Sequence, residues 1–198
     1  AIQLIDMAIE AGADCVKFQM RCLEDLYSKD ALDISKSDLS TQYTIGLLRK
    51  FELTNAEYIK IAKYCSEKNI LFLCTPWDIK SVDLIERIGV PAYKVASADM
   101  TNYAILDYIC EKGKPLILST GMSTEEEIDD VVQYLKNKKN SVQFALLHCN
   151  STYPAPFKDI NLNYIKKLKK HNVIIGYSGH ERGIAITLSA VALGAMII

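Results

Sequence analysis

A short polar segment, residues 176–183, combines residue types that bind anions and metal ions. It carries Ser178 and His180 among three glycines, between an apolar run at 173–175 and another at 184–193. The first run predicts a strand, and the spacing of the second predicts a helix. In parallel α/β folds ligands bind at such junctions, because glycines allow close backbone approach and a new helix offers unpaired N–H groups. The segment could equally be a surface loop with an incidental histidine.

Further polar side chains follow the other predicted strands. In chain order they are Lys17 and Gln19; Thr75; Lys94, Ser97 and Asp99; Ser119 and Thr120; and His148, Asn150, Ser151 and Tyr153. A lysine in an apolar strand environment is costly unless an anion pairs with it, and nearby hydroxyl and amide groups suit phosphate oxygens. The set therefore indicates a site for phosphate or a phosphorylated substrate.

Each candidate also has a structural alternative. Lys17 could pair with Asp99 or Glu24, and Lys94 could be the Schiff-base nucleophile of an aldolase. His148, at the end of an apolar strand, could be a hydrogen-bonded core residue rather than a ligand. The number of candidates after successive strands favours a site more than any single residue does.

Strands and helices that position these residues alternate along the chain. Strands are predicted over 14–19, 70–74, 92–97, 115–120, 142–149 and 173–178 and from 196 onward; helices over 1–11, 54–68, 80–89, 103–112, 123–137, 162–171 and 184–193. Capping boxes, Thr54 with Glu57 and Ser123 with Glu126, predict two helix starts. Residues 21–53 form a long connection with a short helix at 44–51. His171, at a helix end beside lysines, is expected to be exposed.

This alternation predicts an α/β fold, the (β/α)8 TIM barrel, whose chemistry lies at the carboxyl ends of the strands. No GxGxxG fingerprint follows a strand, which disfavours a dinucleotide-binding fold, and a doubly wound flavodoxin-like sheet is the alternative. A helix precedes the first strand, and the last strand reaches residue 198. Residues 1–198 are therefore expected to form a single, incomplete barrel domain, with the first strand missing and the last strand truncated.

The composition is that of an ordinary globular protein. The 198 residues are 49% hydrophobic and 24% charged, and the net charge of -1 gives no global field that would attract nucleic acid or an anionic membrane. None of the six cysteines forms a CxxC pair, and most lie in apolar runs. They predict buried thiols in a reducing compartment and hence a cytoplasmic protein. No signal peptide or membrane-length apolar segment occurs.

Six motifs in chain order resemble those of the N-acetylneuraminate (sialic acid) synthase family. They are VKFQ at 16–19, TPW at 75–77, YKVASAD at 93–99, LSTGM at 118–122, LHCNSTYP at 147–154 and GYSGHE at 176–181. The resemblance implies an enzyme that condenses phosphoenolpyruvate with N-acetylmannosamine, its phosphate or a related amino-sugar aldehyde. It also implies a divalent metal ion, Mn2+ first and Mg2+ second. The motifs specify the family better than they specify the sugar.

The resemblance also implies a role for each matched residue. Binding of the phosphate and carboxylate of phosphoenolpyruvate is implied for Lys17, Thr75, Lys94, Ser97 and Ser178, and for Ser151, whose role Asn150 could share or take. Gln19, Asp99 and Tyr153 match catalytic positions that face the sugar or the condensing carbons, and Asp99 stands where many relatives have Glu. His180 matches one of two metal-binding histidines.

Other parts of the family's site are expected outside residues 1–198. They are a second metal-binding histidine, a glutamate on the first strand and a C-terminal antifreeze-like domain that lends an arginine to the partner subunit. The whole protein is accordingly expected to be a homodimer that binds neither nucleic acid nor membrane. Legionaminate, pseudaminate and spore-coat sugar synthases are close alternatives within the family. A Schiff-base aldolase using Lys94 and a non-catalytic sugar-phosphate-binding barrel are alternatives outside it.

Overall fold

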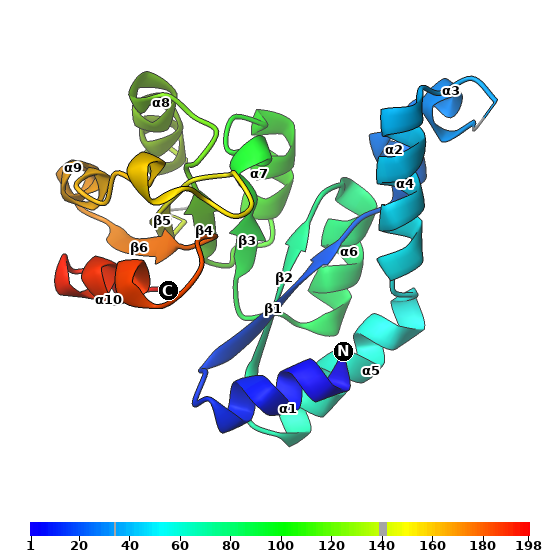
Figure 1. The fold of residues 1–198 in the computed structure, drawn as a ribbon, viewed down its shortest axis with the longest axis horizontal. Helices are drawn as coiled ribbons and strands as arrows, with labels where there is room; N and C mark the ends of the chain where they lie inside the picture. The colour runs from blue at the N-terminus through cyan, green and yellow to red at the C-terminus, as the bar shows by residue number, and fades with distance from the viewer. Residues whose placement is uncertain (34, 139–141) are drawn as a thin grey trace. The chain divides into compact units, whose positions relative to one another are not determined.

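The computed structural model describes residues 1–33, 35–138 and 142–198, which divide into two compact units, residues 1–91 and 92–198 (Figure 1). Both units alternate strands with helices, and every strand pair is parallel. The predicted α/β class is therefore confirmed. Within the described residues, no helix is both long enough and apolar enough to cross a membrane.

The first unit contains a two-stranded sheet and six helices among its described residues. Its elements are α1 (Ile2–Glu10), β1 (Cys15–Met20), α2 (Leu23–Leu26), α3 (Lys29–Leu32), α4 (Leu39–Phe51), α5 (Asn55–Glu67), β2 (Leu71–Pro76) and α6 (Ile79–Ile88). β1 pairs with β2 in a register that sets Gln19 beside Thr75. Side chains alternate across a strand, so Lys17, Gln19 and Thr75 share one face of this sheet.

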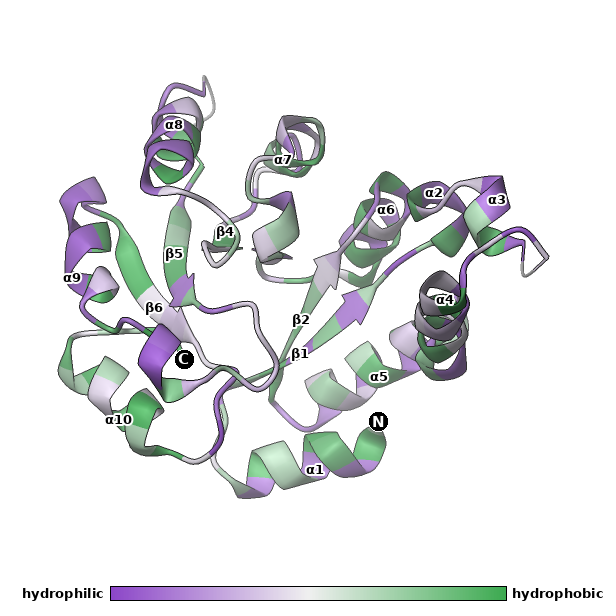
Figure 2. Ribbon diagram, turned by 45° about the horizontal axis from the view of Figure 1, so that its top comes forward, coloured by the Kyte–Doolittle hydropathy of each residue, from purple (hydrophilic) through white to green (hydrophobic). Residues whose placement is uncertain are grey.

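The second unit contains a four-stranded sheet in the sequential order β3-β4-β5-β6. Its elements are β3 (Tyr93–Val95), a 3-10 turn (Ser97–Asp99), α7 (Tyr103–Cys110), β4 (Leu116–Ser119), α8 (Glu125–Lys136), β5 (Phe144–Cys149), a 3-10 turn (Phe157–Asp159), α9 (Tyr164–Leu168), a 3-10 turn (Lys169–His171), β6 (Ile174–Ser178) and α10 (Ala185–Ala192). Helices α8, α9 and α10 lie on the same side of this sheet (Figure 2).

The two faces of the second sheet differ in chemistry. The face toward the helices carries buried apolar side chains, including Tyr93, Val95, Leu118 and Leu146. The strand register places Lys94, Ser119, Cys149 and Ser178 on the opposite face, together with apolar side chains such as Ile117, Ala145 and Leu147. Polar residues predicted after separate strands thus share one face because the strands are parallel and in register.

Local signals explain most element boundaries, and several expectations need correction. The capping box of α5 forms as predicted between Thr54 and Glu57, but the box of α8 uses Thr124 and Glu127 instead of Ser123 and Glu126. The connection at 21–53, whose residue 34 lies outside the described residues, contains three helices rather than one. Helix α4 begins at Leu39, earlier than predicted, because the Asp38 side chain accepts a hydrogen bond from the Thr41 N–H.

The third correction concerns His171, which is 7% exposed rather than solvated, and whose Nε2 lies 3.2 Å from a carboxylate oxygen of Asp129. The expected strand at 196–198 is not assigned as one. Its backbone nevertheless lies beside β6, because the Met196 N–H donates to the Ile175 carbonyl and the Tyr177 N–H donates to the Ile197 carbonyl, both at 2.8 Å.

The cysteines are unpaired thiols, as predicted. Four of them are buried, namely Cys65, Cys74, Cys110 and Cys149, whereas Cys15 and Cys22 are only half-buried.

Asp78 joins two parts of the first unit. One carboxylate oxygen accepts the Ser81 N–H at 2.7 Å and caps α6, and the other accepts the Ser81 hydroxyl at 2.8 Å and the Cys22 N–H at 2.7 Å. The side chain is buried. A single carboxylate therefore accepts N–H groups from the start of α6 and from the connection after β1, and so links these two segments.

Replacing Asp78 with Ala should lower the free energy of unfolding by about 2–3 kcal/mol, because buried donors lose their acceptor. Thr124→Ala, which removes an exposed cap, is the control and should cost about 1 kcal/mol. Urea unfolding of the two variants measures both effects. An Asp78→Ala loss no larger than the control's would contradict the linking role.

Candidate functional site

Lys94 is the most deeply buried of the predicted charged residues. Its side chain is 4% exposed, and its ammonium group donates to the Ser119 hydroxyl at 2.6 Å and to the Val95 carbonyl at 2.7 Å. These acceptors aim the charge toward the carboxyl ends of the strands. A positive charge in a poorly solvated place attracts an anion more strongly than a surface lysine does.

Ser97 and Ser151 meet at the backbone of Gly121. The Ser97 hydroxyl accepts the Gly121 N–H at 3.2 Å and lies 3.1 Å from the Cys149 thiol. The Ser151 hydroxyl lies beside the same glycine. The loops after β3, β4 and β5 therefore converge and present two hydroxyl groups, which are suitable ligands for anionic oxygens.

His180 is held by the loop after β5. Its Nδ1 lies 2.7 Å from the Asn150 carbonyl, and its Nε2 lies 2.8 Å from the Tyr153 hydroxyl. The imidazole and the Tyr153 ring also stack, with centroids 4.0 Å apart, and the Ala155 N–H donates to the His180 carbonyl at 3.0 Å. Three predicted site residues, Asn150, Tyr153 and His180, thus form one contact group.

Glu181 also fixes the loop that carries His180. Its carboxylate accepts hydrogen bonds from the Tyr177 hydroxyl at 2.7 Å and the Thr187 hydroxyl at 3.3 Å. Burial opposes ionisation of Glu181, but these hydrogen bonds, together with backbone hydrogen bonds at Glu181 and His180, outweigh it and lower the pKa of Glu181. The loop is consequently tied to both β6 and α10.

Asp99 lies at the end of the 3-10 turn that follows β3. Its Oδ1 accepts a hydrogen bond from the Asn102 side chain at 3.1 Å, whereas its buried Oδ2 finds no partner among the described residues. Burial raises the pKa of Asp99, and the Asn102 hydrogen bond offsets this in part. A carboxyl group with a raised pKa is better suited to proton transfer near neutral pH.

Lys17, Gln19 and Thr75 belong to the first unit and share one face of its sheet. Thr75 is buried, but Lys17 and Gln19 are exposed, so the expectation of an apolar environment fails for Lys17. The Gln19 amide oxygen accepts hydrogen bonds from Arg21 at 2.7 Å and from the Trp77 indole at 3.1 Å. Gln19 is therefore oriented by two neighbours that were not among the predicted site residues.

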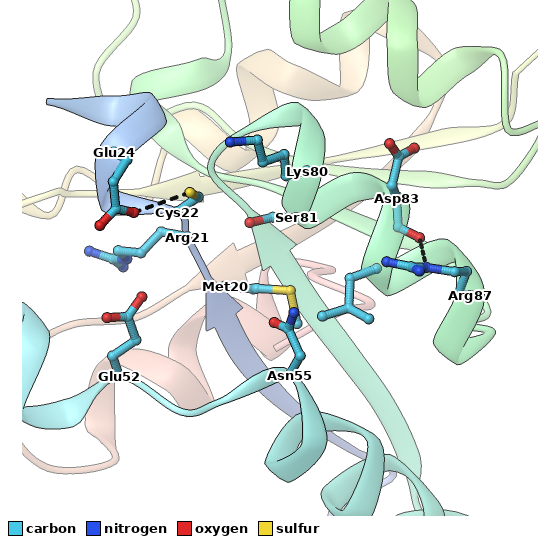
Figure 3. Close-up of a pocket in the computed structure, with 11 residues that line it drawn as sticks. Met20, Arg21, Cys22, Glu24, Glu52, Asn55, Lys80, Ser81, Asp83 and Arg87 are labelled. Carbon is cyan, nitrogen blue, oxygen red and sulfur yellow. Dashed lines mark hydrogen bonds between the residues drawn. The ribbon is translucent and has the colours of Figure 1, made fainter.

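Pockets in the first unit lie outside most of the predicted site. The pocket in Figure 3, of about 390 Å3, lies between the end of β1 and helix α6. Its walls include three cations, Arg21, Lys80 and Arg87, and three carboxylates, Glu24, Glu52 and Asp83. A second pocket, of about 230 Å3, reaches Gln19 and is mostly apolar. The balanced charges in Figure 3 give that pocket no preference for an anion.

A metal centre requires several ligands converging on one point, as in the three or four protein ligands of zinc sites. Across residues 1–33, 35–138 and 142–198, no group of three or more His, Cys, Asp or Glu side chains could hold a metal ion. The described residues therefore do not fit a metal centre by themselves, and His180 stands as a single candidate ligand.

His148 is a core residue, which was one of its two predicted readings. It lies on the helix side of β5, where its Nε2 hydrogen-bonds the Ile160 carbonyl and its ring packs near Tyr164 and Tyr177. Burial lowers its pKa, and the hydrogen bond to Ile160 opposes that shift in part.

Three residues that organise the site were not predicted to do so: Gly121, Cys149 and Glu181. Ser119 was noted only as a polar residue at the end of a strand. From the sequence alone, the alternation of side chains along β4 and β5 could have predicted that Ser119 and Cys149 lie on the same sheet face as Lys94. The close approach of Gly121 to Cys149 and Ser151 depends on the paths of two loops, which spacing does not reveal.

Comparison with known proteins gives a consistent result. Residues 4–198 match the model of the NeuB family. An uncharacterized protein of Methanocaldococcus jannaschii is 41% identical over 99% of this chain, which spans 55% of that protein. The N,N'-diacetyllegionaminic acid synthase of Campylobacter jejuni is 37% identical over 100% of this chain, which spans 61% of that enzyme. The chain therefore spans less than two thirds of the length of either relative.

A solved structure agrees with these relatives. The sialic acid synthetase of Leptospira borgpetersenii, in complex with citrate, has a TM-score of 0.88 and 36% identity, over 100% of this chain and 65% of that one. Further relatives are named as synthases of N-acetylneuraminate 9-phosphate and of pseudaminic acid, and as a spore coat polysaccharide biosynthesis protein.

The lowered pKa of His148 predicts a pH effect on stability. A histidine in the unfolded chain titrates near pH 6.5, so below that pH the unfolded state binds more protons and folding stability falls. His148→Gln keeps a donor for the Ile160 carbonyl but does not titrate here, so it should lose less stability between pH 7 and pH 5. Urea midpoints at the two pH values measure this difference. Equal losses in both proteins would show that His148 does not contribute.

Proposed function

Because the chain belongs to the NeuB family, we propose that the whole protein condenses phosphoenolpyruvate with an N-acetylated amino-sugar aldehyde. N-acetylmannosamine or its phosphate is the proposed aldehyde, and the products are a sialic acid or related nonulosonate and phosphate. The observation that carries the proposal is the buried Lys94 ammonium, held beside Ser119 on the sheet face that also carries Ser178.

The proposed anion site lies at the carboxyl ends of β3 to β6. Lys94 supplies charge, while Ser97, Ser151 and Ser178 supply hydroxyl groups for the phosphate and carboxylate oxygens. The Asn150 amide already bonds the Asp159 carbonyl at 3.1 Å and the Thr152 N–H at 2.9 Å, so its proposed role is mainly to shape the loop. For Lys17 and Thr75, which belong to the first unit, binding of phosphoenolpyruvate remains a prediction from the family resemblance.

The proposed sugar-facing residues are Gln19, Asp99 and Tyr153. The Gln19 amide is oriented by Arg21 and Trp77, and the Tyr153 hydroxyl is oriented by His180. Asp99 has one oxygen fixed by Asn102 and a raised pKa, which suits it to exchange a proton with a sugar hydroxyl or with water.

The proposed reaction forms one carbon–carbon bond and replaces the bond from C2 to the phosphate oxygen with a bond to a water oxygen. C3 of the enol phosphate attacks the aldehyde carbon, whose oxygen takes up a proton. Water adds at C2 and releases a proton, which balances the one taken up, and the tetrahedral adduct loses phosphate by cleavage of its C2–O bond to leave a ketone. Lys94 and the hydroxyl groups stabilise the negative charge on phosphate and carboxylate, and the site holds the two substrates together.

We further propose that the fold is of the (β/α)8 barrel type. The sequential order of β3 to β6, with α8, α9 and α10 on one side of the sheet, supports a barrel over a doubly wound sheet, which carries helices on both faces. The cytoplasmic location and the homodimer remain predictions.

The relatives do not single out one sugar. They are named for legionaminic, neuraminic and pseudaminic acids, and the residues matched to them mainly concern the enol phosphate. A legionaminate, pseudaminate or spore-coat sugar synthase is therefore an alternative proposal, which a panel of hexosamine substrates would decide.

The first test measures phosphate release by the whole protein from phosphoenolpyruvate and each hexosamine, with Mn2+ present. Lys94→Met keeps the packing of the side chain but removes its charge, and it should raise the KM for phosphoenolpyruvate roughly a hundredfold, or about 3 kcal/mol of lost binding. Lys114→Met is the control. Lys114 lies just before the amino end of β4, away from the carboxyl ends of the strands, so KM should be unchanged.

Three results would contradict the proposal. An unchanged KM in Lys94→Met would remove this lysine from the anion site. Borohydride trapping of substrate on Lys94 would instead identify a Schiff-base aldolase. Ligand binding without phosphate release from any hexosamine would favour a non-catalytic sugar-phosphate-binding protein.

We also propose that His180 supplies one ligand to a divalent metal ion, Mn2+ before Mg2+. His180→Ala in the whole protein should weaken Mn2+ binding at least tenfold, within the range seen when metal-site residues are altered. Phosphoenolpyruvate affinity should be largely retained. Tyr153→Phe, which removes a hydrogen bond to the imidazole but leaves its nitrogens, should weaken Mn2+ binding less than His180→Ala does. Calorimetry showing unchanged Mn2+ affinity in His180→Ala would count against the ligand role.

A further inference from the structure

Three loops of the second unit meet at Gly121, the second residue after β4. The Gly121 N–H donates to Ser97 after β3, while Cys149 and Ser151 approach from the end of β5. The thiol of Cys149 lies 3.1 Å from the Ser97 hydroxyl, and its side chain is 5% exposed. Cys149 is also paired in register with Ser178. Gly121 and Cys149 thus contact or adjoin three serines assigned to the proposed anion site.

We propose that Gly121 and Cys149 are positioning residues that set the spacing of the Ser97, Ser151 and Ser178 hydroxyls for the anionic substrate. This inference rests on the proposed function of the same site. Neither residue needs to touch the substrate. Gly121 acts by leaving room for the loop after β5, and Cys149 acts by filling the space between the hydroxyls with a buried sulfur atom.

The geometry at Gly121 excludes a larger residue without movement. A Cβ atom there would lie 2.5 Å from the Cys149 sulfur, 2.8 Å from the Ser151 hydroxyl oxygen and 2.9 Å from the Cys149 carbonyl oxygen. The two side chains could rotate, but the carbonyl belongs to the backbone at the end of β5. A side chain at 121 must therefore displace the strand end that carries Ser151 or the loop that binds Ser97.

The requirement at Gly121 is packing rather than backbone conformation. The glycines with left-handed backbones in this chain are others, at 12, 89, 113, 183 and 194. An alanine at 121 therefore tests close approach without adding the strain of a positive φ. Displacements of about 1 Å in groups that position a substrate can cost up to roughly a hundredfold in rate.

The experiment compares Gly121→Ala with two controls in the whole protein. Gly121→Ala should raise the KM for phosphoenolpyruvate roughly tenfold or more and change kcat much less, because the hydroxyls bind the anion in ground and transition states alike. Gly46→Ala, an exposed glycine whose added Cβ meets nothing within 4 Å, should leave both constants unchanged. Val131→Ala, which creates a cavity at the buried face of α8, should lower the thermal midpoint and leave KM unchanged.

A double mutant distinguishes an effect on the positions of the hydroxyl groups from a general loss of stability. The Cys149 sulfur is the nearest obstacle to the new Cβ, so Cys149→Ala should itself raise KM but should recover part of the Gly121→Ala defect when the two are combined. The combined effect should then be smaller than the product of the single effects. Cys149→Ser, which keeps a polar partner for Ser97, should be closer to the parent than Cys149→Ala.

Two outcomes would overturn the inference. One is a Gly121→Ala protein with the parent's KM for phosphoenolpyruvate, and the other is single effects that multiply in the double mutant. Failure of the proposed function is distinguishable, because the parent protein would then release no phosphate from phosphoenolpyruvate with any hexosamine.

Discussion

The constraint on which the second unit depends is the parallel, in-register pairing of β3, β4, β5 and β6. Parallel strands end at the same edge, and side chains alternate between faces, so residues far apart in the sequence become neighbours on one face. Lys94 lies within 2.6 Å of Ser119 for this reason, and Cys149 lies beside Ser178. The same register turns His148 toward the helices, where it packs as a core residue.

At the carboxyl ends of these strands, a buried charge lies among loops that are fixed by specific contacts. A buried ammonium group is costly unless its hydrogen bonds are satisfied, and Lys94 has two short ones to oxygen atoms. Around it the loops are fixed by contacts that are independent of one another: Gly121 with Ser97, His180 with Asn150 and Tyr153, and Glu181 with Tyr177. A site built from several loops needs such ties, because each loop alone has considerable freedom.

The sequence was sufficient for the α/β class, the family and the order of elements outside the 21–53 connection and residues 196–198, because apolar periodicity and the six motifs are local signals. It was less reliable where tertiary packing decides. His171 is buried and lies beside Asp129 of α8, and α8 is capped by Thr124, although Ser123 also fits the motif. The environments of Lys17 and Lys94 differ although both follow the same strand pattern. The meeting of Gly121, Ser97 and Cys149 requires three loop paths, which no spacing rule supplies.

The central claim is that Lys94 and the hydroxyl groups beside it hold a doubly charged enol phosphate. The most direct test is a crystal structure of the whole protein with phosphoenolpyruvate bound. The account predicts density for the intact enol phosphate with its anionic oxygens within hydrogen-bonding distance of the Lys94 ammonium and of Ser97, Ser151 or Ser178. Density for the ligand away from these residues, or a covalent imine on Lys94, would contradict it.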